Sequence, residues 1–208
     1  SMAQLGNHPN IVAVFDLGKV LLDFDYSITA RQLANGSDVA EQKLQAAIDQ
    51  SDLLLDYEVG KLTTNEFKAA FCQQTGYRGS DEEFRAAFAD IFAEIPEMVR
   101  LQARLKAAGV PCIIFSNTNE IAIHHICQKF PFFAGFDGYV YSYQVKAMKP
   151  DEAIFEALEE ATGRSGEQLL YVDDRLENIE KGRKRGWQTV HHVNPAESIA
   201  AFAAAGFV

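Results

Sequence analysis

One stretch decides the fold of this chain: Ile11-Val-Ala-Val-Phe-Asp16-Leu-Gly18-Lys19-Val-Leu-Leu22. Its first five residues are apolar, which is typical of a strand buried inside a sheet. The run stops at the carboxylate of Asp16, and Gly18 follows two positions later. Sheets present reactive groups at the carboxyl ends of their strands, so this pattern predicts a nucleophile at Asp16, in a site at the sheet edge.

Further β-like runs occupy residues 111–115, 138–143, 169–172 and 189–193, and from the first of them onward helical patterns separate the runs. Glycines 109, 163 and 186 mark the expected ends of three of these helices. Alternation of strands and helices implies right-handed crossovers between parallel strands. The predicted fold class is therefore α/β, with a doubly wound parallel sheet.

Between the first two runs lie about 80 residues without a strand pattern, too many for a loop. Thr63 with Glu66, and Ser80 with Glu83, form two capping boxes that predict helix starts. Behind them, apolar residues recur at helical spacing and are expected to form a core: Phe67, Phe71, Phe84, Phe88, Ile91 and Phe92. This predicts a helical domain at 27–92, inserted into an α/β core made of 1–26 and 93–208.

Three further polar clusters each follow an apolar run or lie in a loop just beyond one. They are Ser116-Asn117-Thr118, Lys149-Pro150, and Asp173-Asp174-Arg175 with Asn178. Each alone has an ordinary explanation, as a helix cap, a helix start or a loop. Together with the carboxylate after the first strand, they predict one phosphoryl-transfer site.

The order and spacing of these clusters resemble the haloacid dehalogenase (HAD) superfamily, in particular its small phosphatases with an inserted helical type 1 cap. The resemblance covers nearly the whole chain, and all four motif positions of the family can be located. The chain departs from the family at Gly18, where a second aspartate is usual, and at Lys19, where a small or neutral residue is usual. The Phe-Asp-Leu-Gly start is similar to that of bacterial sugar-phosphate phosphatases, so Gly18 is compatible with activity.

The resemblance implies a role for each cluster. Asp16 would attack phosphorus and form an aspartyl-phosphate. A Mg²⁺ cofactor would be bound by Asp16, the backbone carbonyl of Gly18, and Asp174. Behind these ligands, Asp173 and Asn178 would orient waters. The phosphate would be contacted by Ser116 and the amide of Asn117. Lys149, the second catalytic residue, would place one positive charge beside both Asp16 and the phosphate.

The missing aspartate would normally protonate the leaving oxygen and activate water, which is worth about 10²- to 10⁴-fold in rate. A hemiacetal phosphate, as in a sugar 1-phosphate, needs less of this help. Glu58 is a substitute acid, a substrate contact or merely an exposed carboxylate at a helix end. Lys19 either adds positive charge near the phosphate or competes with the metal for Asp16.

The composition of the chain disfavours some classes of binding partner. The formal charge is −10, from 19 basic and 29 acidic residues, which disfavours nucleic acids and anionic membranes. No run approaches about 18 apolar residues, and the first nine residues lack a signal pattern, so a cytoplasmic protein is expected. Three cysteines without close spacing predict neither a disulfide framework nor a thiolate zinc site. The oligomeric state is left open.

Three functions are compatible with these residues. The first is a Mg²⁺-dependent phosphatase of a small phosphorylated metabolite, with a sugar phosphate as the expected substrate. The second is a metal-independent dehalogenase in which Asp16 attacks carbon, disfavoured by the acidic pair Asp173-Asp174. The third is a binding protein that keeps the fold without turnover.

Overall fold

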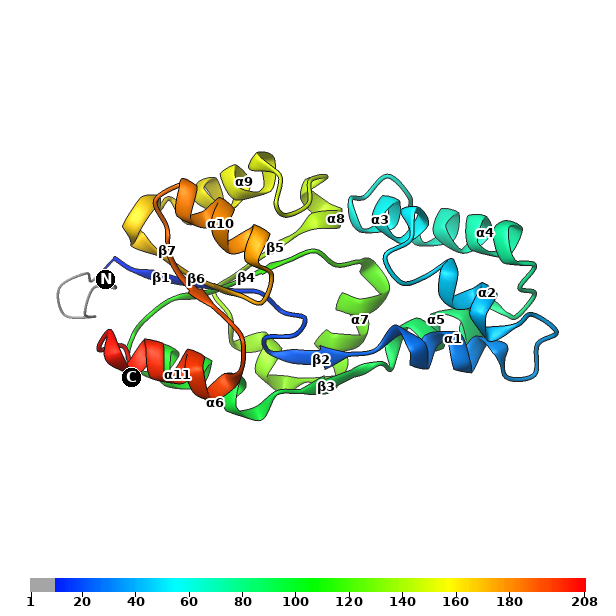
Figure 1. The fold of residues 1–208 in the computed structure, drawn as a ribbon, viewed down its shortest axis with the longest axis horizontal. Helices are drawn as coiled ribbons and strands as arrows, with labels where there is room; N and C mark the ends of the chain where they lie inside the picture. Colours follow the sequence, from blue (N-terminus) through cyan, green and yellow to red (C-terminus); the bar gives the residue numbers. More distant parts are fainter. Residues whose placement is uncertain (1–9) are drawn as a thin grey trace.

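The computed structural model describes residues 10–208 and has a parallel five-stranded sheet at its centre (Figure 1). The strand order is β5-β4-β1-β6-β7, and every neighbouring pair runs parallel. The strands are β1 (Val12–Phe15), β4 (Cys112–Ser116), β5 (Gly138–Tyr141), β6 (Leu169–Asp173) and β7 (Gln188–His191). The predicted α/β class is confirmed, with the strand before Asp16 at the centre of the sheet.

Helices cover both faces of the sheet, which explains why β1 is apolar throughout. On one face lie α9 (Glu152–Thr162) and α10 (Leu176–Lys184), and on the other α6 (Pro96–Ala107), α7 (Glu120–Lys129) and α11 (Pro195–Ala204). Ala13 and Phe15 pack into the cluster that contains Leu101 of α6. Val12 and Val14 belong to a second cluster on the α9 and α10 side. Neighbouring side chains of a strand point to opposite faces, so both sets are buried.

Five helices lie between β2 (Leu22–Phe24) and β3 (Phe92–Glu94). They are α1 (Tyr26–Ala34), α2 (Glu41–Ala46), α3 (Asp52–Glu58), α4 (Thr64–Thr75) and α5 (Asp81–Ala89). Both predicted capping boxes are present, at the starts of α4 and α5. The rings of Phe67, Phe71, Phe84 and Phe88 contact one another in a cluster of their own. These four phenylalanines therefore form part of a hydrophobic core, as the sequence predicted.

The expectation that this segment contains no strand was wrong. A short antiparallel hairpin, formed by β2 (Leu22–Phe24) and β3 (Phe92–Glu94), carries the chain into and out of the helical group. Phe92 lies in β3, and α5 already ends at Ala89, so the helical spacing of Ile91 and Phe92 was misleading. Strands of three residues are too short for alternation to be visible in the sequence.

Two strand ends were also predicted too late. The run 138–143 leaves the sheet after Tyr141, where α8 (Ser142–Val145) begins, and the run 189–193 ends at His191. Short 3₁₀ turns at Pro131–Gly135 and Gly166–Gln168 complete the described elements. The predicted domain boundary after residue 92 falls inside β3, and the division into two domains stays a prediction.

No helix in residues 10–208 combines the length and apolarity that a membrane crossing requires. The nine residues on which the absence of a signal pattern was argued lie outside the described part. Cys72, Cys112 and Cys127 are free thiols, and of the three only Cys112 is buried.

Candidate active site

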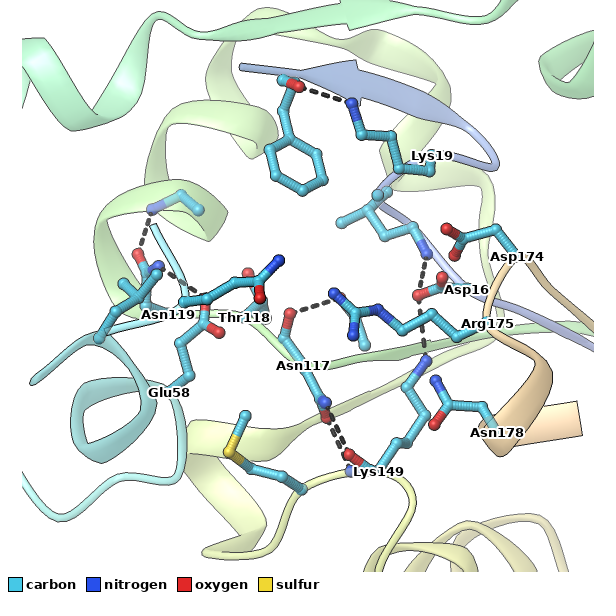
Figure 2. A pocket seen from close by; sticks show the side chains of 18 of the residues that line it. Asp16, Lys19, Glu58, Asn117, Thr118, Asn119, Lys149, Asp174, Arg175 and Asn178 are labelled. Carbon is cyan, nitrogen blue, oxygen red and sulfur yellow. Dashed lines mark hydrogen bonds and ion pairs between the residues drawn. The ribbon is translucent and has the colours of Figure 1, made fainter. Parts of the chain in front are cut away.

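A cavity of about 840 Å³ opens at the carboxyl ends of β1, β4 and β6, between the sheet and the helical group (Figure 2). Most residues predicted for the site line it: Asp16, Gly18, Glu58, Ser116, Asn117, Lys149, Asp174 and Asn178. Asp173 is fully buried directly behind it. The structure thus brings the four separate sequence clusters together.

Lys149 is the centre of the site. Its Nζ donates to Asp16 Oδ1 at 3.0 Å, to Asp173 Oδ2 at 2.8 Å and to the Phe115 carbonyl at 2.8 Å. Burial lowers the pKa of Lys149, but the two carboxylates more than offset this and hold the pKa above its ordinary value. The ammonium is therefore charged, and it links the ends of β1, β4 and β6.

Asp173 is saturated with hydrogen bonds. Besides Lys149, the Tyr171 hydroxyl and Asn178 Nδ2 donate to Oδ2, the latter at 3.2 Å, and the Arg175 backbone N–H donates to Oδ1 at 2.9 Å. Burial would raise the pKa of Asp173, yet the ammonium and these donors bring the pKa below its ordinary value. With both oxygens bonded, the carboxylate is suited to holding Lys149 in place.

Asp16 directly follows β1 and accepts N–H bonds only on Oδ1, from Lys149 and from the Leu17 backbone at 2.9 Å. Its other oxygen receives no N–H donor from the described chain. Burial and the nearby charge of Asp173 raise the pKa of Asp16 well above its ordinary value, despite the opposing effect of Lys149. The single charge of Lys149 is therefore not enough to stabilise the ionised form of Asp16, which needs a further positive charge nearby.

The donor set fits a hard divalent cation. Carboxylate oxygens of Asp16, Asp173 and Asp174 lie within 4.8 Å of one another. Among these groups, only the ammonium of Lys149 balances the three carboxylates. A bound cation would therefore compensate the excess negative charge. Asp174 is half-buried and lines the cavity, whereas both oxygens of Asp173 are already bonded.

Asn117 connects the end of β4 to the loop that carries Lys149. Its Nδ2 donates to the Lys149 carbonyl at 3.0 Å, and its Oδ1 accepts from the Lys149 backbone N–H at 2.9 Å. The next residue, Thr118, is fixed by Ser142, whose Oγ accepts from the Thr118 N–H at 2.9 Å. The Asn117 side chain is thus used to position Lys149, which leaves its backbone amide for the predicted phosphate contact. Ser116, at the end of β4, is buried at the cavity surface.

Glu58 is not the exposed helix-end carboxylate that was one of the sequence alternatives. It ends α3, lines the cavity and is half-buried, with Asn119 Nδ2 donating to its Oε2 at 3.4 Å. Burial raises the pKa of Glu58 to about 7. Asn119 was not singled out from the sequence, although an asparagine before Glu120 is a helix N-cap signal, and its Oδ1 does cap α7 by accepting from the Ala122 N–H at 3.0 Å.

Lys19 lines the cavity, and its side chain is bonded to the neighbouring hairpin and not to Asp16. Its Nζ donates to Asp23 Oδ1 at 2.7 Å and to the Phe24 carbonyl at 2.7 Å, and the side chain extends away from Asp16 (Figure 2). Phe24 itself lines the cavity with Tyr26 and Phe92. No sequence signal pointed to this aromatic wall, because it depends on the hairpin β2–β3.

We expect Lys149→Met to lower the free energy of unfolding by about 3–5 kcal/mol at pH 8, since it leaves two buried carboxylates without their cation. The loss should shrink toward pH 5. Without the ammonium, the pKa values of Asp16 and Asp173 rise, and the folded state gains protons as the pH falls. Urea unfolding at several pH values measures this. The exposed control Lys184→Met should change stability by less than about 0.5 kcal/mol at every pH. An equal loss at pH 5 and pH 8 would contradict the role of charge.

The chain is similar to known proteins over most of its length. The chain is 26% identical over 194 residues to a D-ribitol-5-phosphate phosphatase of Bacteroides thetaiotaomicron, covering 88% of this chain and 92% of that protein. It is 26% identical over 187 residues to a sesquiterpene phosphatase of Aspergillus oryzae, covering 86% and 88%. The crystal structure of a HAD family enzyme from B. thetaiotaomicron, in complex with magnesium and inorganic phosphate, matches with a TM-score of 0.76 at 25% identity, covering 86% of this chain and 92% of that one.

The model of the haloacid dehalogenase-like hydrolase family matches residues 11–185, which include every cluster of the site. This chain belongs to the haloacid dehalogenase-like hydrolases.

Proposed function

We propose that the protein is a Mg²⁺-dependent phosphatase that hydrolyses a small monophosphorylated metabolite, a sugar or polyol phosphate, through an aspartyl-phosphate at Asp16. One observation carries the proposal: a buried carboxylate held by Lys149 faces, beside Asp174, a cavity large enough for such a substrate. The relatives support it, because two are phosphatases and a structural match contains magnesium and inorganic phosphate.

Each residue of the site would have its own role in the reaction. The oxygen of Asp16 that Lys149 leaves unbonded attacks phosphorus, forming an O–P bond as the bond to the leaving oxygen breaks. Lys149 fixes the other oxygen, while the Ser116 hydroxyl and the Asn117 backbone amide donate to the phosphoryl oxygens. A Mg²⁺ held by Asp16, Asp174 and the Gly18 carbonyl would supply charge neutralisation of the phosphate. Water then attacks phosphorus, and the bond to Asp16 breaks, which restores the carboxylate and releases inorganic phosphate.

Position 18 supplies no acid for the leaving oxygen. A hemiacetal phosphate, whose leaving oxygen is more acidic, needs less help than the phosphate of a polyol, for which the proton must come from solvent or from another group. Glu58 and Asn119 offer a carboxylate and an amide on another part of the cavity wall. Such a pair accepts and donates hydrogen bonds, and it suits the hydroxyl groups of a sugar or polyol. We therefore assign Glu58 to substrate binding.

Asp16→Asn should abolish phosphate release while the fold persists, because the amide is nearly the same size but is not a nucleophile. Turnover with and without Mg²⁺, over a panel of phosphorylated sugars, polyols and small acids, tests the proposal. Circular dichroism controls for folding. Retention of more than about a hundredth of wild-type turnover would argue against covalent catalysis at Asp16. A folded wild-type protein that releases no phosphate from any substrate would leave the binding-protein alternative.

Asp174→Ala should weaken Mg²⁺ binding more than Asp173→Ala, by more than the roughly 10- to 100-fold typical of residues that only support a ligand. Asp173→Ala should instead lower the melting temperature, because it removes a partner of the buried ammonium of Lys149. Titration calorimetry with Mg²⁺ and thermal unfolding separate the two effects. The reverse order of Mg²⁺ affinities would exchange the assignments within the pair.

Glu58 predicts a pH dependence specific to hydroxylated substrates. Its pKa of about 7 means that it ionises between pH 6 and 8, and a carboxylate accepts stronger hydrogen bonds than a carboxylic acid. KM for a polyol phosphate should therefore fall about fivefold over this range, relative to KM for an alkyl phosphate without hydroxyls. The alkyl phosphate controls for ionisation of the phosphate itself. Glu58→Gln should remove the difference, and a parallel pH profile for both substrates in the wild type would refute the assignment.

A further inference from the structure

The side-chain space at Gly18 is taken by the ring of Phe24. A Cβ placed on Gly18 would lie 2.7 Å from Phe24 Cε1 and 3.2 Å from Cδ1, closer than a real contact permits. The glycine does not adopt the left-handed backbone that only glycine tolerates well. The constraint at this position is therefore steric, and an aromatic edge stands two residues from Asp16, where the family usually has its second carboxylate.

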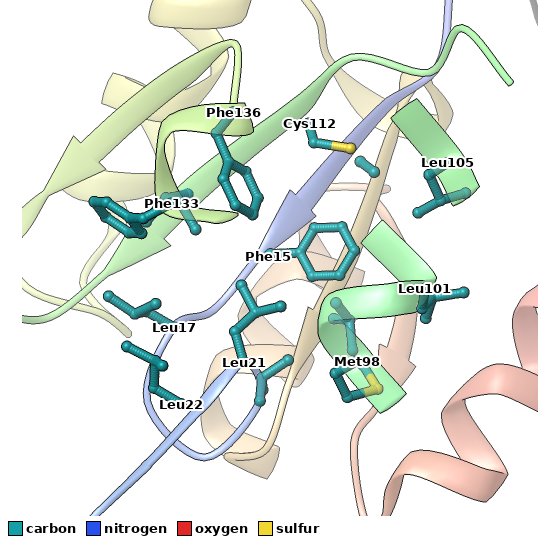
Figure 3. Packing of buried hydrophobic residues seen from close by; sticks show 14 of the residues in the cluster. Phe15, Leu17, Leu21, Leu22, Met98, Leu101, Leu105, Cys112, Phe133 and Phe136 are labelled. Atoms are coloured by element: carbon teal, nitrogen blue, oxygen red, sulfur yellow. The ribbon is translucent and has the colours of Figure 1, made fainter. Parts of the chain in front are cut away.

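The loop that carries Gly18 is anchored in the core. Leu17, Leu21 and Leu22 are buried beneath it (Figure 3). The N–H groups of Leu21 and Leu22 donate to the Leu17 carbonyl at 2.9 and 3.1 Å, and the Lys19 N–H donates to the Leu22 carbonyl at 2.8 Å. This tight turn fixes the start of β2, and with it the position of Phe24.

The Phe24 ring is held on several sides. Lys19 Nζ binds the Phe24 carbonyl and lies 4.6 Å from the ring centroid. Tyr26 packs edge-on at 5.5 Å between centroids, and Phe92 of β3 packs at 6.2 Å from across the hairpin. The ring also lines the cavity, so it presents a fixed apolar surface near the phosphate site.

The remaining charges of the cavity disfavour a second anionic group on the substrate. Each basic side chain in its lining is already paired: Lys19 with Asp23, Lys149 with Asp16 and Asp173, and Arg175 with Glu177 at 3.5 Å. Acidic side chains outnumber them in the lining. A substrate with one phosphate and an otherwise uncharged skeleton matches these walls, with C–H groups on the aromatic side and hydroxyls toward Glu58.

We infer that Phe24 is a specificity-determining residue, positioned by Lys19, whose ring packs against the carbon skeleton of a hydroxylated monophosphate that carries no other anionic group. The inference rests on the proposed phosphatase function and adds the residue that contacts the carbon skeleton and the exclusion of a second anionic group. It also gives the two departures from the family pattern a joint role: Gly18 leaves room for the ring, and Lys19 holds it.

The test is the kinetics of Phe24→Ala with a pentitol monophosphate, together with inhibition by inorganic phosphate, which reports on the phosphate site alone. KM for the pentitol phosphate should rise about 5- to 20-fold, with kcat within about twofold, because the ring binds substrate and transition state alike. The inhibition constant of inorganic phosphate should stay unchanged. Phe132→Ala, which removes a half-buried ring outside the cavity lining, is the matched control and should alter neither constant.

Three further variants test how Phe24 is positioned. Lys19→Met should raise the same KM, and Lys19→Arg should restore part of it by keeping a donor for the Phe24 carbonyl. Gly18→Asp should lower the melting temperature in the wild-type background and much less in Phe24→Ala, because the clash partner is then absent. Equal effects of Gly18→Asp in both backgrounds would overturn the assignment of the space to Phe24.

The outcomes distinguish this inference from the function on which it rests. Wild-type turnover with an unchanged pentitol phosphate KM in Phe24→Ala refutes the role of the ring while the phosphatase stands. A parallel loss of inorganic phosphate binding would show general damage to the site and would also refute it. A lower wild-type KM for an alkyl phosphate or a pentitol bisphosphate would overturn the substrate class. Absence of Mg²⁺-dependent turnover in the wild type removes the proposed function, and the inference with it.

Discussion

The Nζ atom of Lys149 lies 3.0 Å from Asp16 and 2.8 Å from Asp173, in a site where its side chain is 2% exposed. Carboxylates removed from water are stable only when a cation and further donors compensate their charge. This ammonium allows β1 and β6 to end in neighbouring acids at the edge of one sheet. Lys149 lies in the loop before α9 and must be held in place to balance these charges. Asn117 holds it with a reciprocal pair of hydrogen bonds to the Lys149 backbone. The geometry of the nucleophile is thus a consequence of how buried charge is satisfied.

The helical group completes the cavity, and both polar and apolar contacts connect it to the core. Thr64 Oγ1 donates to Glu120 at 2.8 Å, and Lys146 Nζ donates to the Gly60 carbonyl at 2.6 Å. The main apolar clusters of core and helical group are separate, apart from Ile121 of α7, which packs among the helices. Glu58 reaches the cavity on the helical group and is bound there by Asn119 at the start of α7, whereas Asp16 and Lys149 lie at the sheet edge.

The sequence predicted the parts of this structure that depend on local pattern. A carboxylate that ends an apolar run is visible in a single segment, so Asp16, Asp173 and Asp174 could be assigned to one edge before any contact was known. The hairpin β2–β3 could not be predicted, because neither strand is long enough to alternate and its pairing joins residues about 70 positions apart. Phe24 could not be predicted either, since its role follows from that pairing and from the absence of a side chain at Gly18.

Lys19 adopts a backbone conformation that is unfavourable for lysine, which is a reason to regard the residue as part of the site. Its φ is 68°, a left-handed conformation that costs a residue other than glycine about 1 kcal/mol or more. A small or neutral residue would suit the turn equally well or better. Lysine at this place is offset by two hydrogen bonds, one to Asp23 and one to the Phe24 carbonyl, and by contact with the aromatic ring. These bonds hold the Phe24 ring, and Gly18 leaves the space that the ring fills. Both residues therefore contribute to one feature, an aromatic surface where the family usually has a carboxylate.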